Sequence, residues 1–166
     1  MLALTLKPCV TSLWTKLGIP DTTPDSAALD RSLIDDILEL LASERVDYTI
    51  FWRRLSHSDA GADPQAVRDL FINQTGIEAW LLRYSSITSN TNLRLAVDLM
   101  LKTNPKFVLR NHLGEQAIQK AKLKDFSQVD ILLMLLESPY EEHAEFDAHA
   151  GFPPDWASNI EISCSS

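Results

Sequence analysis

The segment LDRSLIDDILELL, residues 29–41, decides the fold. Its apolar side chains recur at the three- and four-residue spacing of one helix face, and acids occupy the opposite face. The apolar stripe comprises Leu29, Leu33, Ile34, Ile37, Leu40 and Leu41, and the polar face comprises Asp30, Asp35, Asp36 and Glu39. The pattern predicts an amphipathic helix against a core, and Pro24-Asp25-Ser26 just upstream offers residues suited to capping its start.

The same helical spacing recurs downstream of this segment. Three further stripes are Tyr48, Phe51, Trp52 and Leu55, then Ile77, Trp80, Leu81 and Tyr84, then Leu93, Ala96, Val97, Met100 and Leu101. Asp47 is placed to cap the first of these helices. Residues 57–64 are polar and are predicted to form a loop. No segment shows the two-residue alternation that is typical of a strand.

Two more helices are predicted before residue 138. Asn104 followed by Pro105 is a start signal, because proline at the first helical position loses no needed hydrogen bond. Asp125 with Gln128 resembles a capping box for the next helix. The inward positions are expected to be Leu109, Leu113, Ala117 and Ala121 in the first of them, and Val129, Leu132, Leu133 and Leu136 in the second, which Ser138-Pro139 ends.

These patterns predict an all-α protein with six or seven amphipathic helices in a single irregular bundle. Residues 1–166 are interpreted as one domain, with 1–13 divergent or loosely attached and 138–166 forming an irregular tail. Phe152 and Trp156 are expected to anchor that tail on the helices. The hydrophobic content of 45% supports a core, because a chain of this length buries roughly 70% of its unfolded surface.

Composition excludes several classes of protein. The net charge is −8, from 23 acids and 15 bases, and an acidic surface repels the phosphates of nucleic acid. No apolar run approaches the about 20 residues that span a bilayer, so no membrane helix is predicted. The first residues lack the pattern of a signal peptide. Cys9 and Cys164 make neither a zinc site nor a disulfide framework, which favours a reducing, cytoplasmic location.

Few residues of the sequence suggest catalysis or metal binding. His143 and His149 lie among Glu141, Glu142, Glu145 and Asp147, but the spacing matches no standard metal site, so a solvated loop is the preferred interpretation. Adjacent acids such as Asp35-Asp36 point about 100° apart on a helix. No glycine-rich phosphate loop is present. Cys164 is a candidate redox residue, since a thiol near a chain end is reachable.

Several segments carry a resemblance to a known family. The strongest is Asn104-Pro-Lys-Phe-Val-Leu-Arg-Asn111. The others, in order, are Lys16-Leu-Gly18, Asp47-Tyr48-Thr49 with Phe51, Gln116-Ala-Ile118, Asp125-Phe126, Pro139-Tyr140, Pro153-Pro-Asp-Trp156 and Ile160-Glu-Ile-Ser-Cys-Ser-Ser166. Together they resemble the C-terminal part of the selenoprotein O family, whose bacterial members are called YdiU.

The resemblance implies a kinase-like fold that transfers AMP from ATP to Ser, Thr or Tyr hydroxyls of proteins with a divalent metal such as Mg²⁺. That chemistry needs a lysine–glutamate pair, metal-binding Asp and Asn residues and a loop over the nucleotide. In the family these parts lie upstream of the matched region. The chain is therefore expected to be a C-terminal portion with no catalytic, cofactor-binding or metal-binding residues of its own.

The resemblance also implies roles for a few residues here. Family members place selenocysteine or cysteine third from the end, which implies a regulatory thiol at Cys164 paired with a cysteine of the kinase-like part. Cys9 lies outside the matched region, and Glu161 stands where a Cys-x-x-selenocysteine arrangement needs cysteine. Asn104, Arg110 and Asn111 are candidates for contact with the missing kinase-like region. Local capping and solvent exposure are the alternative for Arg110 and Asn111.

Two other functions stay open at this point. The chain could be a stand-alone interaction module that docks on a protein through an exposed apolar face. It could also bind metal through its histidine- and glutamate-rich tail. The expected location is the bacterial cytoplasm; a mitochondrial location would apply to a eukaryotic member, which nothing in the sequence indicates.

Overall fold

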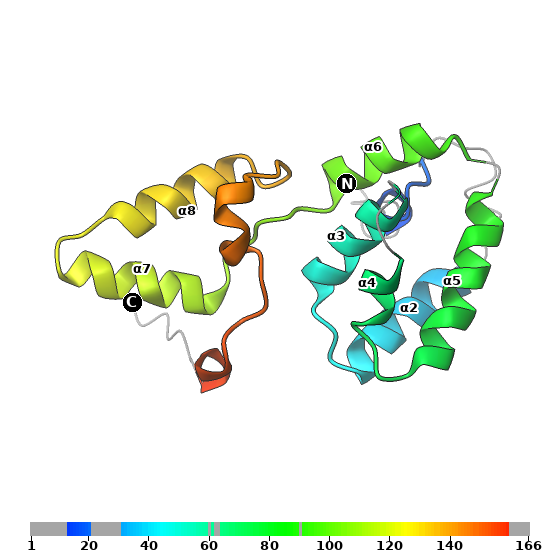
Figure 1. The fold of residues 1–166 in the computed structure, drawn as a ribbon, viewed down its shortest axis with the longest axis horizontal. Coiled ribbons are helices and arrows are strands. Elements are labelled where there is room, and N and C mark those ends of the chain that lie inside the picture. Colours follow the sequence, from blue (N-terminus) through cyan, green and yellow to red (C-terminus); the bar gives the residue numbers. More distant parts are fainter. Residues whose placement is uncertain (1–12, 21–30, 60, 62–63, 90, 160–166) are drawn as a thin grey trace, which may run out of the picture. The chain divides into compact units, whose positions relative to one another are not determined.

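The computed structural model describes residues 13–20, 31–59, 61, 64–89 and 91–159. These residues form helices and connecting segments without a strand, which confirms the predicted all-α class. The chain divides into two compact units, Met1–Asn104 and Pro105–Ser166 (Figure 1). That residues 1–166 behave as one domain stays a prediction. None of the helices in the described residues has the length and apolar character needed to cross a membrane.

The first unit is built from helices that pack on one another in pairs. Its labelled helices are α2 (Ser32–Ser43), α3 (Tyr48–Asp59), α4 (Gln65–Arg68), α5 (Gln74–Thr88) and α6 (Leu93–Thr103). Helix α2 packs on α5, α3 packs on α4 and α6, and α4 packs on α5 (Figure 1).

The stripe of residues 29–41 does pack into the core of this unit. Its members Leu33, Ile34, Ile37 and Leu41 are buried and Leu40 is partly buried, whereas Leu29 and the proposed cap at 24–26 lie outside the described residues. Aromatic rings fill the space beside them. Phe51 meets the rings of Trp52, Phe71 and Trp80 edge-on, and Trp80 stacks on Tyr84. The predicted inward faces of α3 and α5 are thus confirmed for these rings.

Local capping explains where α3 and α5 begin. The Asp47 carboxylate accepts a hydrogen bond from the Ile50 amide at 2.9 Å, which confirms the predicted cap of α3. At α5, the Asn73 side chain accepts from the Gly76 amide at 2.9 Å. Such caps satisfy amide groups that have no partner inside the helix.

The second unit is a helical hairpin followed by short helical turns. Helix α7 (Asn111–Lys122) packs on α8 (Ser127–Glu137), and two 3₁₀ helices follow, η2 (Ala144–His149) and η3 (Asp155–Asn159). The core of this unit is small: the buried cluster comprises Leu113, Ala117 and Leu132. The segment predicted as a wholly irregular tail therefore contains regular turns up to Asn159.

The predicted helix start at Asn104-Pro105 is wrong. Asn104 instead follows the last residue of α6 in an extended conformation (φ −101°, ψ 100°), and α7 begins only at Asn111. The helical backbone conformation is disfavoured for a residue that precedes proline, which explains why the helix does not continue through Asn104. The amides of Lys106 and Phe107 donate to the Pro139 carbonyl at 2.8 and 3.1 Å, so the segment is held without helical bonds.

The predicted loop at residues 57–64 begins too early. Helix α3 continues through His57 and Ser58 to Asp59, and residues 60, 62 and 63 lie outside the described part of the chain. The reason is tertiary: Asp59 is bonded to the Tyr84 hydroxyl of α5, which holds the last turn of α3 in place.

The predicted inward face of α8 is wrong for three of its four members. Leu132 is buried, but Val129, Leu133 and Leu136 are exposed, and the other buried residues are Gln128 and Leu135. Apolar residues cover more than one side of this helix, so spacing alone cannot tell which side meets α7.

The predicted capping box of α8 is also wrong. Asp125 accepts a bond from the Ser127 amide at 3.0 Å, and the Gln128 side chain lies against His149 instead of reaching back to Asp125.

Candidate functional site

Asn104 joins three segments of the first unit. Its side chain is fully buried, and its amide nitrogen donates to the Lys16 carbonyl at 3.0 Å and to Ser56 Oγ at 2.9 Å. Its side-chain oxygen accepts from Lys16 Nζ at 3.2 Å. Its backbone carbonyl accepts from Arg53 at 2.9 Å. These bonds make Asn104 an internal brace of this unit; its contact with a missing kinase-like region stays a prediction.

Lys16, which binds Asn104, also contacts two aromatic rings of α3. Its ammonium lies 5.7 Å from the ring centre of Tyr48 and 5.9 Å from that of Trp52, within the range of a cation–π interaction. Burial lowers the pKa of Lys16. No local pattern predicts this role, because Lys16 and Asn104 are 88 residues apart in the chain.

Gly18 brings this same segment close to α6. Its φ is +75°, a value that residues with a Cβ rarely adopt. A Cβ added there would lie 2.9 Å from the Ala96 Cβ and 3.2 Å from Met100 Cγ. The turn that follows Lys16 therefore requires glycine for both conformation and space.

The other predicted site residues belong to the second unit. Arg110 precedes α7 in an extended conformation (φ −90°, ψ 146°), and its side chain makes no capping bond. Asn111 is the first residue of α7 and is exposed. Their contact with another region stays a prediction. Cys164 lies outside the described residues.

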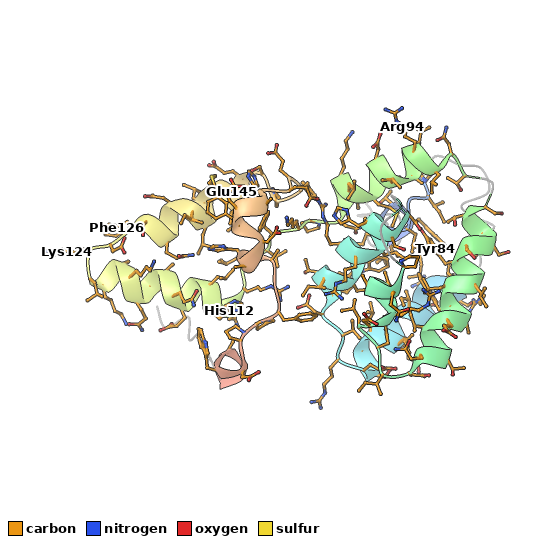
Figure 2. All side chains as sticks on the ribbon, viewed as in Figure 1. Tyr84, Arg94, His112, Lys124, Phe126 and Glu145 are labelled. Atoms are coloured by element: carbon orange, nitrogen blue, oxygen red, sulfur yellow. The ribbon has the colours of Figure 1, made fainter. Side chains whose placement is uncertain are left out.

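A pocket in the first unit holds an acid whose pKa is raised by burial. The pocket has a volume of about 420 Å³ and is lined by residues of α3, α4 and α5, with Asp59 and Tyr84 among them. The Tyr84 hydroxyl lies against the Asp59 carboxyl and 3.1 Å from the Leu17 carbonyl. Figure 2 shows Tyr84 among the helices of this unit, whereas Arg94 points outward from α6.

The electrostatics of this pair favour uncharged groups. Burial raises the pKa of Asp59, and the hydrogen bond with Tyr84 only partly offsets that effect. Burial, together with the Asp59 charge, raises the pKa of Tyr84. Sequence patterns do not reveal this pair, because Asp59 falls in the predicted loop at 57–64 and Tyr84 belongs to a predicted apolar stripe.

Asp59→Asn is expected to change how stability depends on pH. The folded-state pKa of Asp59 is raised above 3.8, so the folded protein binds more protons than the unfolded chain in the window between the two pKa values. The free energy of unfolding therefore falls as pH rises through that window. The amide does not ionise, so the variant gains stability relative to the parent as the pH rises above about 4, by less than about 1 kcal/mol because solvent screens a carboxylate that is only partly buried. Urea unfolding at each pH measures the difference.

Asp98→Asn serves as the matched control for this experiment, because Asp98 is an exposed acid on α6. This variant removes the same formal charge from a side chain that is not buried. An equal pH-dependent gain of stability in both variants would contradict the assignment of this pH dependence to the Asp59 carboxyl.

The second unit places two histidines beside a pocket of about 240 Å³. His112 is buried and meets the Trp156 ring edge-on with centroids 6.1 Å apart. His149 Nε2 lies 3.0 Å from Gln128 Nε2. Burial lowers the pKa of His112, and the charges of Arg110 and His149 add to that effect. His112 is thus a packed histidine whose neutral form is favoured (Figure 2).

The tail is held less tightly at its two predicted anchors than expected. Trp156 contacts His112 but is 49% exposed, and Phe152 is 56% exposed. A stronger hold comes from Lys106, which was not singled out in the sequence. Its ammonium lies 2.5 Å from Asp147 and 3.1 Å from Glu142. Burial lowers the pKa of Lys106, but these bonds outweigh burial and the net shift is upward.

The acidic tail does not assemble a metal site from its histidines. His143 Nε2 lies 2.8 Å from Ser138 Oγ, and His149 faces Gln128, so the two rings have separate neighbours. Across the described residues, no group of three or more His, Cys, Asp or Glu side chains is arranged to hold a metal ion.

An ATP–magnesium site does not fit the acids and bases of the pocket that contains Asp59. Magnesium prefers charged carboxylates, whereas burial raises the pKa of Asp59 and so favours its neutral form. Arg68 is a base that lines the pocket, but it lies 4.0 Å from Glu78 in the same wall, and this acid partly neutralises its attraction for a phosphate. The pocket therefore does not suit an ATP–magnesium complex.

The structure thus defines a helical region with internal polar braces, and comparison with known proteins identifies its family. The profile of the family described as "Protein adenylyltransferase SelO" matches residues 7–137. This match covers most of the chain, so the chain belongs to the SelO family.

Curated relatives support the same family. A protein nucleotidyltransferase YdiU of Albidiferax ferrireducens is 66% identical over 93% of this chain and 31% of its own length. YdiU proteins of Variovorax paradoxus and Dechloromonas aromatica are 58% and 44% identical, each over 91% of this chain and 30% and 31% of their own lengths. The chain thus spans about a third of the length of these relatives.

Proposed function

We propose that this chain is the C-terminal helical region of a SelO-type protein adenylyltransferase, and that it supports the catalytic part instead of performing the chemistry. In the complete protein, ATP and Mg²⁺ would bind outside this region, and AMP would pass to Ser, Thr or Tyr hydroxyls of proteins.

One observation carries the proposal. A chain that matches the SelO profile over residues 7–137 spans only 31% of its YdiU relative. Two of its buried or partly buried polar side chains serve internal bonds: Asn104 binds Lys16 and Ser56, and Asp59 binds Tyr84. Buried polar groups that are already satisfied hold a fold together and leave little capacity for a ligand.

The test is a transfer assay with the 166-residue chain. Incubated with ATP radiolabelled on the α-phosphate, Mg²⁺ and a test protein, the chain alone is expected to transfer no AMP. Equilibrium dialysis against the same nucleotide is expected to show no saturable binding.

The complete YdiU protein of Albidiferax ferrireducens is the positive control, and it is expected to label the test protein under the same conditions. Labelling by the chain alone would overturn the proposed supporting role. Failure of an intact, folded YdiU control to transfer AMP would overturn the adenylyltransferase assignment.

Cys164 adds a regulatory element to this proposal. As the family resemblance implies, its thiol would form a disulfide with a cysteine of the catalytic part, outside this chain.

A further inference from the structure

Helix α8 and the residue before it carry a second apolar stripe that the described residues of the second unit leave uncovered. The stripe consists of Phe126, Val129, Leu133 and Leu136, whose side chains are 57%, 41%, 57% and 37% exposed. Leu132 and Leu135 on another side of the helix are buried. A helix with apolar residues on more than one side is normally covered on more than one side.

The spacing of this stripe indicates what kind of surface covers it. Its members are separated by three, four and three residues, which is the a–d–a–d spacing of a helix that packs along a second helix. Figure 2 places Phe126 at the turn between α7 and α8, where the stripe begins. The opposing surface is therefore expected to be a helix with an apolar seam.

The charges beside the stripe select the partner helix. In this register Asp130 and Glu137 occupy e positions, which are the positions that meet charged residues of the partner. A second copy in parallel would place Leu132 against Glu137, and a second copy in antiparallel would place the two e acids together. Neither arrangement supplies a base, so lysine or arginine on a different helix is the complement.

We propose that the stripe of α8 packs against a basic, apolar-seamed helix supplied by the part of the SelO protein that lies outside this chain. The inference rests on the proposed function, because that function makes this chain one region of a longer protein. The matched YdiU protein has more than two thirds of its length outside the region matched here, which is ample to supply such a helix.

Carbene footprinting of two proteins tests the proposal. Photolysed diazirine is expected to label Phe126, Val129, Leu133 and Leu136 in the chain alone. In the complete Albidiferax ferrireducens YdiU protein, labelling at the aligned positions is expected to fall about tenfold, as for side chains that enter a well-packed interface. Leu135 is the internal control, since it is buried and stays unlabelled in the chain alone.

Substitutions give a second, independent measurement. Leu133→Glu is expected to leave the urea midpoint of the chain alone unchanged and to lower the midpoint of the complete YdiU protein when made at the aligned position. Leu123→Glu is the matched control, because Leu123 is 82% exposed and lies outside the stripe. It is expected to change neither midpoint.

Three outcomes would overturn the proposal. The first is strong labelling of the aligned stripe in an active, complete YdiU protein. The second is an equal effect of the two substitutions on the urea midpoints, and the third is a dimer of the chain in sedimentation velocity with its stripe protected from labelling. The first would leave the proposed function standing, whereas AMP transfer by the chain alone would remove the proposed function and leave the footprint unaffected.

Discussion

Gly18→Ala is expected to lower the free energy of unfolding by about 2–5 kcal/mol, since the strain of a left-handed alanine costs about 1–2 kcal/mol and the overpacking of a core costs about 1–3 kcal/mol. The strain arises because φ at this position is +75°. The overpacking arises because the added Cβ would lie 2.9 Å from the Ala96 Cβ and 3.1 Å from the Ala96 carbonyl oxygen. Urea unfolding followed by circular dichroism measures the loss.

Gly61→Ala separates the two contributions. Gly61 also has a positive φ, +95°, but an added Cβ there meets nothing within 4 Å. Its replacement is therefore expected to cost only the backbone strain, about 1–2 kcal/mol. Equal losses for the two variants would show that the close approach of Gly18 to α6 contributes nothing.

Asn104→Ala is expected to destabilise the chain by about 2–4 kcal/mol, because it leaves buried polar groups without partners. The variant removes the donor to the Lys16 carbonyl and to Ser56 Oγ, and the acceptor for Lys16 Nζ. Water cannot easily replace these bonds, because the Asn104 side chain is fully buried. Thermal and urea unfolding monitored by tryptophan fluorescence measure the change.

Two further variants test the physical reason for that loss. Asn73→Ala removes an exposed helix cap and is expected to cost only about 1 kcal/mol. Ser56→Ala is expected to cost less in the Asn104→Ala background than alone, because its partner is already absent. Strictly additive losses would show that the two side chains do not act through their shared bond.

Periodicity predicted the parts of the fold that a single buried face determines. Leu33, Ile34 and Ile37 in α2, and Ile77 and Trp80 in α5, were assigned to the core from spacing alone, and they are buried. Each of these helices has one apolar side, so only one orientation removes that side from water. The class and most helix positions follow from this constraint.

Periodicity failed where a residue has two compatible roles. Asn104 beside proline is suited to begin a helix, but it forms bonds with Lys16, 88 residues away, which no local pattern reveals. Asp59 likewise extends α3 through a bond to Tyr84, 25 residues away. In α8, Leu132 and Leu133 fit an inward position equally well, and only the pairing with α7 decides between them.

Some of the predicted site residues have partners inside this chain, and the others depend on groups outside it. The sequence identified Asn104 as a distinctive residue, and its surroundings show an internal brace. The proposed contacts of Arg110 and Asn111 and the redox role of Cys164 depend on groups outside this chain, so they stay predictions. Lys106 was missed because its two acidic partners come from a tail whose path a sequence pattern does not define.

The small core of the second unit bears on how long this polypeptide survives in a cell. Its buried cluster of Leu113, Ala117 and Leu132 is modest beside the aromatic core of the first unit. Segments with few buried contacts open most often, and proteases cleave the opened form. Turnover of the chain on its own would therefore begin between Pro105 and Asn159, and a covering partner would lengthen its lifetime without any change in the first unit.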